Sequence, residues 1–201
     1  MGWTENSEFD EPAGKSFLFA PMKLLNLLAA LLLTTTLQAA DDIIWHIKAV
    51  HPEGRLIDVK AVDAEGKLHA VKAIQVPGNA HLLDIKALVG DAKLPVKILV
   101  SGDKLQPVKA VAVDGTVLGI KAVLPDGAKL DVKGVSSAGS IINIKAIAAD
   151  GTNYGIKAIS PDGHLYDVKG IKLGTDKVEG KVNGVEFAAH VKALPQAVGP
   201  K

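Results

Sequence analysis

The sequence predicts an all-β fold, in which about 12–13 short strands form an antiparallel meander that closes into a barrel or folds into a two-layer sheet. Three observations predict it: a lysine recurs at nearly regular spacing, Val and Ile occupy alternate positions around it, and glycine-containing turns separate the copies. A unit of about twelve residues is too short and too β-branched for a helix with its own loop. It fits a strand of about seven or eight residues followed by a tight turn.

The first forty residues are expected to lie outside this fold. Residues 1–21 are acidic and aperiodic, and we expect them to be a non-native or disordered extension ahead of a true start at Met22. Residues 22–40 are typical of a signal peptide, with a basic Lys23, an apolar run of about fourteen residues and a small-residue cleavage site near Ala39. The alternatives are an uncleaved membrane anchor and a buried helix of the fold. A signal peptide predicts export to the periplasm, the cell surface or the outside of the cell.

The β-repeat domain is expected to cover residues 41–194. Its lysines follow Ile or Val and mostly stand twelve residues apart. The spacing is fourteen before Lys86 and eleven before Lys97, and it is lost between Lys169 and Lys192. Ten near-equal spacings do not arise by chance, so the chain contains a genuine internal repeat. Duplication of a three-strand block is the simplest cause of a weaker period of 36 residues.

The turns favour the meander over a β-solenoid with 36-residue coils, which a weaker period of 36 residues would also allow. Most turns carry Pro or Ala, then Asp or Glu, then Gly, which suits a type I turn closed by a left-handed glycine. A loop of this kind is frequent in β-hairpins and makes successive strands antiparallel neighbours. The turns are Pro52-Glu53-Gly54, Ala64-Glu65-Gly66, Pro125-Asp126-Gly127, Ala138-Gly139, Ala149-Asp150-Gly151 and Pro161-Asp162-Gly163.

The hairpin register predicts which residue faces each lysine. With Ser160 opposite His164 across the loop, Lys157 faces Asp167 on the next strand. Opposite charges across strands contribute roughly 0.2–1 kcal/mol, and exposed pairs lie at the low end of that range. The alternation puts Ile156 and its equivalents on a small, apolar core face. The same register predicts the pairs Lys121–Asp131 and Lys48–Asp58, and it leaves Ala70, Gly119, Asn143 or Gly155 opposite other lysines.

Composition narrows the classes of function. The chain has no cysteine, which excludes disulfides and thiolate metal sites. The net charge is +1 and Arg55 is the only arginine, which argues against a nucleic-acid partner because phosphate and base recognition relies largely on arginine. The sequence contains no known catalytic or phosphate-binding motif, so we expect neither enzymatic activity nor a cofactor.

The repeated lysines form the candidate site. They would hold an anionic polymer, such as an acidic polysaccharide, through multivalent charge. The alternative is a solvated ladder of lysines and aspartates that prevents sheet slippage and aggregation. The candidate anion-binding surface consists of Lys48, Lys60, Lys72, Lys109, Lys121, Lys133, Lys145, Lys157 and Lys169.

Other polar residues predict no site. One acid per turn does not supply the converging oxygens of a calcium loop. The six histidines lack metal-ligand spacing and are expected at the surface, mostly in or near turns. Asp58 and Asp84 occupy a repeated position, which favours a structural role over a catalytic carboxylate pair.

The two ends of the repeat domain are expected to differ from its middle. Trp45 opens the first repeat and is expected to cap the core. From Leu173 the pattern breaks, and one more hairpin around Asn183-Gly184 is expected to cap the sheet. Residues 195–201 are expected to form a disordered tail.

These features predict an exported, non-enzymatic β-repeat protein that acts as a structural or adhesive binding module. The alternative is a carbohydrate- or anionic-polymer-binding accessory domain, or an enzyme with its site at the mouth of a barrel. The expected partner is an anionic polysaccharide or another cell-surface component, with membrane contact only through an uncleaved signal segment. A pocket of convergent, non-repeated polar residues would favour the alternative.

Overall fold

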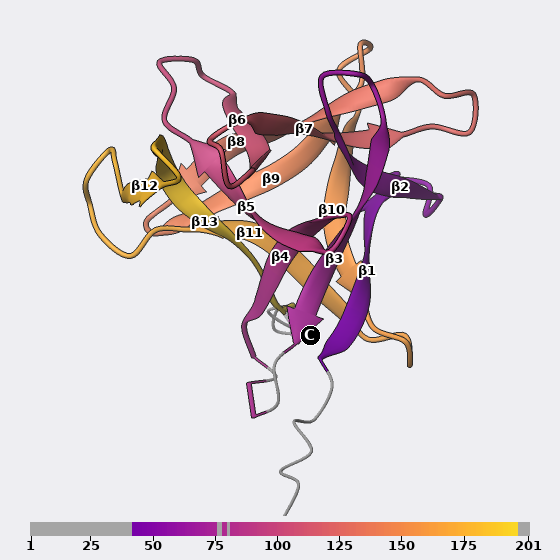
Figure 1. Cartoon of the computed structure of the whole chain (residues 1–201). Helices are drawn as coiled ribbons and strands as arrows, with labels where there is room; N and C mark the ends of the chain where they lie inside the picture. The colour runs from indigo at the N-terminus through magenta and orange to yellow at the C-terminus, as the bar shows by residue number, and fades with distance from the viewer. Residues whose placement is uncertain (1–41, 76–77, 80, 197–201) are drawn as a thin grey trace, which may run out of the picture. The chain divides into compact units, whose positions relative to one another are not determined.

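The computed structural model describes residues 42–75, 78–79 and 81–196. The expected extension, the signal peptide and residues 197–201 lie outside these residues. The described residues form thirteen strands. No helix among these residues is long and apolar enough to cross a membrane. The strands are β1 (Ile43–Val50), β2 (Leu56–Val62), β3 (Leu68–Gln75), β4 (Leu83–Val89), β5 (Ala92–Leu99), β6 (Gln106–Val111), β7 (Val117–Val123), β8 (Lys129–Ala138), β9 (Ile141–Ile147), β10 (Asn153–Ile159), β11 (Leu165–Ile171), β12 (Gly180–Val182) and β13 (Val185–Pro195) (Figure 1).

The strands pair as a meander. Each strand from β1 to β10 pairs with its successor, β12 pairs with β13, and all pairings in the described part of the chain are antiparallel. The predicted all-β antiparallel meander is therefore confirmed. A β-solenoid, which stacks parallel strands, is excluded.

Every long strand has three long neighbours, whereas a strand in a simple barrel has two. β1 shows how: Ile43–His46 pair with β3, Lys48–Val50 pair with β2, and His46–Val50 pair with β10 along the other side. Among the strands in the described part of the chain, only the short β12 pairs with a single strand, β13. The pairings therefore close the sheet on itself with a connectivity more branched than that of a simple barrel.

The pairings divide the twelve long strands into four groups of three mutually paired strands. The groups are β1–β3; β4, β5 and β13; β6–β8; and β9–β11. Each group pairs with each of the other three through the strand pairs β1–β10, β2–β7, β3–β4, β5–β6, β8–β9 and β11–β13. Four groups joined by six pairings have the connectivity of a tetrahedron. In Figure 1, β13 lies beside β5 and β4 although they are far apart in the sequence.

The core is built from the residue that precedes each lysine. Twelve such residues, all Ile or Val, point to one central cavity of about 10 Å³. A space of this size holds at most one water molecule, so the interior is filled by side chains. The alanines that follow the lysines are fully buried around it, which confirms the small, apolar core face. The cavity is lined by Ile47, Val59, Val71, Ile85, Val96, Val108, Ile120, Val132, Ile144, Ile156, Val168 and Val191.

The hairpin loop at 160–164 has the predicted geometry. The Ser160 amide donates to the His164 carbonyl at 3.0 Å, and the Gly163 amide donates to the Ser160 carbonyl at 3.1 Å. Gly163 has a φ of 90°, which a residue with a side chain rarely adopts. The turn chemistry therefore fixes this hairpin and, by repetition, the register of the strands around it.

Ala138-Gly139 does not belong to this class of loop. Ala138 ends β8 and pairs with Ile141, so the loop contains only Gly139 and Ser140. Two-residue loops of this kind often carry glycine at positive φ, and Gly139 has a φ of 57°. A register shift between Gly134 and Ser136 places one extra residue in β8, and this makes up for the residue that the shorter loop lacks. The twelve-residue spacing is kept here by a different loop and a bulge.

The end of the chain completes the sheet. The predicted hairpin is confirmed, because Asn183 (φ 49°) and Gly184 (φ 81°) connect β12 to β13. β13 extends through Pro195, into the segment expected to be a tail, and Pro195 pairs with Tyr166. At the other end of the repeats, Trp45 is buried and its Nε1 donates to the Gln75 side chain at 3.0 Å.

Candidate functional site

The repeat places its lysines opposite one another at the six pairings that join the groups. Like charges directly opposite on neighbouring strands are destabilising, so this arrangement needs compensation. Within each group, by contrast, a lysine faces the residue that stands two positions before the next lysine. The opposed lysines are Lys48–Lys157, Lys60–Lys121, Lys72–Lys86, Lys97–Lys109, Lys133–Lys145 and Lys169–Lys192.

Three lysines and one aspartate gather on each group of strands. The first cluster is Lys48, Lys60, Lys72 and Asp58; the second is Lys86, Lys97, Lys192 and Asp84; the third is Lys109, Lys121, Lys133 and Asp131; the fourth is Lys145, Lys157, Lys169 and Asp167. The nine lysines predicted from the sequence form the first, third and fourth clusters. The second cluster was not predicted, because its lysines are irregularly spaced and one of them comes from the distant β13. Its equivalence to the other three clusters is therefore not visible in the sequence.

In each cluster the aspartate binds two of the three lysines. Asp58 accepts a short hydrogen bond from Lys48 and lies 3.6 Å from Lys60 Nζ. The predicted pairs Lys157–Asp167, Lys121–Asp131 and Lys48–Asp58 are confirmed, and Lys192–Asp84 is a fourth that the sequence did not predict.

The lysines keep the aspartates ionised. The hydrogen bond from Lys48 is the main reason why the pKa of Asp58 lies below its ordinary value. Burial opposes ionisation of the other three aspartates, but the hydrogen bonds and charges of their lysines outweigh it and lower the pKa of each. The opposed lysine pairs are thus partly compensated from inside the clusters.

The third lysine of each cluster makes no ion pair with the aspartate in the described structure. These lysines are Lys72, Lys97, Lys109 and Lys145, and they face His46, His190, Gly119 and Gly155. Burial, and then the charges of Lys60 and Lys48, lower the pKa of Lys72. Three ammonium groups and one carboxylate leave each cluster with two uncompensated positive charges.

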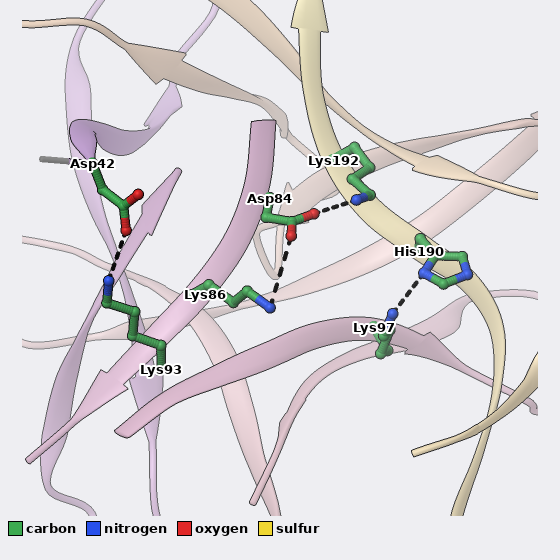
Figure 2. A network of polar contacts seen from close by, with 7 residues as sticks. All are labelled: Asp42, Asp84, Lys86, Lys93, Lys97, His190 and Lys192. Atoms are coloured by element: carbon green, nitrogen blue, oxygen red, sulfur yellow. Dashed lines mark hydrogen bonds and ion pairs between the residues drawn. The ribbon is translucent and has the colours of Figure 1, made fainter. Parts of the chain in front are cut away.

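The second cluster has the most perturbed lysine. Figure 2 shows Asp84 between Lys86 and Lys192, with Lys97 turned instead toward His190. Lys97 Nζ lies 2.6 Å from His190 Nδ1 and 4.5 Å from the centroid of the Phe187 ring. Burial, reinforced by the charges of the other two lysines, lowers the pKa of Lys97 to about 8. This environment of Lys97 could not be predicted from the sequence, because Phe187 and His190 precede the last lysine in a segment without the repeat.

The first cluster has the same chemical groups in a more open arrangement. His46 Nδ1 lies 2.9 Å from Lys72 Nζ, and the Lys72 charge is the main reason why the pKa of His46 is lowered. A cavity of about 260 Å³ is lined by His46, the three lysines and Asp58, with Ala70 as the small residue opposite Lys60. This cavity is mostly polar, and the core residues Ile47, Val59 and Val71 also contribute to its lining.

A larger groove of about 500 Å³ lies beside Trp45 and Tyr166. It contains Ser160, Asp162 and His164, but the carboxylate stands in the middle: Ser160 donates to Asp162, and His164 Nε2 lies 3.1 Å from Asp162. Nucleophilic catalysis needs the histidine between the serine and the acid. Ser160 also accepts the His164 amide hydrogen bond, so these residues stabilise the hairpin loop.

The other polar residues considered in the sequence have structural partners. Asp126 and Asp150 accept backbone hydrogen bonds within their own turns, at 3.0 and 2.8 Å. The expectation that the histidines lie at the surface is wrong for His69, which is 8% exposed and lies 2.8 Å from Asp63. Asp58 and Asp84 belong to different clusters and do not form a pair. No group of three metal-ligating side chains occurs among the residues that the structure describes.

One comparison identifies relatives. Residues 41–194 match a family model described as a family of unknown function (DUF7486), so the chain belongs to this family. No curated protein and no solved structure matches the chain.

Proposed function

We propose that this member of a family of unknown function is an exported, non-enzymatic binding module that holds anionic polysaccharide at its four lysine clusters. The observation that carries the proposal is the composition of the clusters, each with three lysines around a single aspartate. Excess positive charge concentrated at four points is unusual in a chain whose net charge is only +1.

The arrangement of the clusters supports a repetitive ligand. One cluster contributes two uncompensated charges, which gives only weak binding to an exposed anion in water. Four clusters on one module would engage successive charges of one polymer, and linked weak contacts raise the overall affinity by about 10²–10⁴. A polysaccharide with an acidic group at regular intervals has this chemistry.

The surroundings of the clusters also support this ligand class. Large aliphatic side chains at the strand ends remain exposed, among them Leu56 (55%), Leu165 (46%) and Val117 (44%). Sugar rings have apolar faces that pack against such residues. Lysine rather than arginine supplies the charge, which favours point-charge attraction to carboxylate or sulfate over the forked recognition of nucleic acid.

The experiment is chromatography of the purified chain on heparin, a sulfated polysaccharide, with a salt gradient. We expect retention at low ionic strength and elution as salt increases, because the contacts are between charges partly exposed to solvent. Lys72, Lys97, Lys109 and Lys145 changed together to Gln should move elution to much lower salt.

A matched control separates the clusters from net charge. It changes four exposed lysines outside the clusters to Gln: Lys67, Lys104, Lys129 and Lys177. Elution of the control close to the wild type supports the proposal. Equal shifts for the two variants, or no retention of the wild type, would show that the clusters are not binding sites.

Export is tested separately. The first residue of the protein from its native host should be Asp41 or Ala40, since the predicted signal peptide ends there. An intact Met1 would contradict the predicted export.

A second candidate function, carbohydrate binding or catalysis at the groove beside Trp45, is favoured by one observation: the groove residues are not repeated. Tyr166 is partly exposed there and packs against Trp45 in a tilted arrangement, with ring centroids 4.5 Å apart. This candidate predicts binding of neutral oligosaccharides that Tyr166→Ala abolishes and that salt does not weaken, as measured by titration calorimetry.

A further inference from the structure

We propose that the first cluster is a binding site for one tetrahedral oxyanion, a sulfate or phosphate group, held by Lys72, Lys48 and Lys60 with His46 as an additional donor. This inference rests on the proposed function and assigns a chemical group to one of the four clusters. It depends on three features of this cluster: its cavity, the direction of its donors and the absence of a counter-charge for Lys72 in the described structure.

The cavity provides the space. At about 260 Å³ it is several times the roughly 30 Å³ that one water occupies in the liquid, so an oxyanion fits together with a few waters. Lys48 and Lys60 have side chains 29% and 32% exposed, and His46 is exposed, so a ligand reaches these groups from solvent. Ala70 keeps the cavity open on the side of β3.

The polarity of the cavity selects an anion. Lys72, as an ammonium group, donates to His46 Nδ1, which leaves the neutral imidazole with its hydrogen on Nε2. His46 therefore offers a hydrogen-bond donor in addition to the three ammonium groups. The one carboxylate, Asp58, is already bound by Lys48 and Lys60, which compensates its repulsion of a second anion. Three ammonium groups repel a metal ion, so the site is not a cation site.

The charge balance selects a dianion. With His46 neutral, the cluster has two uncompensated positive charges, and a sulfate or a doubly ionised phosphate matches them. Asp58 pairs with Lys48 and Lys60 but not with Lys72 in the described structure, so negative charge is deficient beside the Lys72 ammonium group. Burial, and then the charges of Lys60 and Lys48, lower the pKa of Lys72 accordingly. A bound dianion removes this deficit.

The other clusters provide internal controls. The second cluster has the same groups, His190 and Lys97, but the Phe187 ring lies 4.5 Å from Lys97 Nζ and Pro95 stands where the first cluster has Ala70. The third and fourth clusters have Gly119 and Gly155 in place of the histidine. The first cluster therefore combines the extra donor with the open space.

The experiment is an NMR titration of the full chain with inorganic sulfate and, separately, with inorganic phosphate, in which the His46 ring nitrogens report binding. We expect the His46 signals to move in a saturable way, with much smaller changes at His190. Lys72→Met should weaken the affinity about tenfold or more, because one charged donor is lost. Lys145→Met in the fourth cluster should change it by less than about twofold.

The outcomes are distinguishable. Saturable movement of the His46 signals that Lys72→Met suppresses and Lys145→Met preserves supports the site; equal weakening by both variants, or unmoved His46 signals in the wild type, overturns it. Saturation by sulfate alone identifies a sulfate ester as the natural group, and saturation by phosphate alone identifies a phosphate. Heparin retention without any His46 response would overturn this site and leave the proposed function intact. No heparin retention together with a His46 response would overturn only the polymer.

Discussion

The first and fourth clusters have equivalent strand pairings, and each has three lysines and one aspartate at equivalent positions. The two clusters nevertheless differ at two other positions. His46 and Ala70 of the first cluster correspond to Gly155 and Asn143 of the fourth. Asn143 accepts a hydrogen bond from Lys169 at 2.7 Å, whereas Ala70 leaves Lys60 without such an acceptor. The repeat thus fixes the scaffold and the charge, and two variable positions decide how the charge is satisfied and how open the cluster is.

The same contrast exists beneath the clusters. The residue after each lysine is alanine in most repeats, but Ile98 of the second group is large and Gly170 of the fourth is small. A Cβ added to Gly170 would lie 2.3 Å from Ile98 Cδ1, so the two residues compensate each other in the shared core. Differences between groups therefore do not remain local: one group accommodates the side chain of another.

The largest expected effect is that of Gly170→Ala, which would give the fourth group the residue that the first group has at the equivalent Ala61. It should destabilise the protein by about 3 kcal/mol, the upper end for overpacking, because the new methyl group meets Ile98 in a filled core. Urea unfolding measures the loss. The control is Gly155→Ala, whose Cβ meets the ends of two lysine side chains, Lys145 Nζ at 3.7 Å and Lys157 Cε at 4.0 Å.

A double variant sharpens this expectation. Ile98→Ala removes the closest contact and leaves that with Ile142 Cβ at 3.1 Å. Gly170→Ala should therefore cost less in that background, which appears as a coupling free energy in a double-mutant cycle. Additive effects of the two substitutions would contradict a direct contact between them.

A smaller effect is expected for Gly163→Val in the hairpin of the fourth group. Its φ of 90° is unfavourable for a residue with a side chain, at about 1–2 kcal/mol. Nothing lies within 4 Å of an added Cβ there, so the loss reports the backbone alone. Gly54→Val, at a φ of 88° in the first group, should lose the same amount. Unequal losses, measured by urea unfolding, would show that the two hairpins are not equivalent.

Lys97, the half-buried lysine of the second cluster, predicts a dependence of stability on pH. Because the folded-state pKa of Lys97 is lowered to about 8, below its ordinary value of 10.5, the charged lysine opposes folding at neutral pH. This penalty decreases as the pH rises from about 8 towards 10.5. Lys97→Met should raise the urea midpoint at pH 7 and have less effect at pH 10. Lys145→Met provides the matched substitution opposite a glycine, and an identical pH dependence of both variants would exclude the proposed cause.

The smallest effects are expected for the aspartates. Asp58→Asn and Asp167→Asn should each cost about 0.2–1 kcal/mol near pH 7, with the larger loss at Asp167, whose side chain is 25% exposed against 48% for Asp58. The folded-state pKa of each is lowered, so their contribution is present above the unfolded value near 3.8 and is lost as the pH falls below it. Wild type and variants should therefore converge in stability at acidic pH, and a difference that persists would show another cause.

Local patterns in the sequence predicted local structure. Period, turn residues and the hairpin register were enough for the strands, the loop at Gly163 and the pair Lys157–Asp167, because these depend on residues within one repeat of each other. The two-residue loop at Gly139-Ser140 was missed, because the compensating register shift keeps the spacing of twelve.

Long-range organisation could not be predicted in this way. Lys192 and Asp84 are 108 residues apart, and nothing in the spacing indicates that β13 returns to β4. The opposed pair Lys48–Lys157 was missed for the same reason, since hairpin chemistry specifies only the neighbour along the chain. The contacts of His46 with Lys72 and of His190 with Lys97 depend on such long-range pairings. The sequence therefore predicted only a surface position for these two histidines.

The return of β13 also has a consequence for how fast the protein folds. Three of the four groups consist of consecutive strands and form from segments that are close in the sequence. The second group is complete only when β13 docks, and Lys192 of β13 lies 108 residues after its partner Asp84 of β4. Until β13 docks, the exposed edges of β4, β5 and β11 remain free to pair with other chains. We therefore expect a slow final folding phase that is lost on deletion of β13.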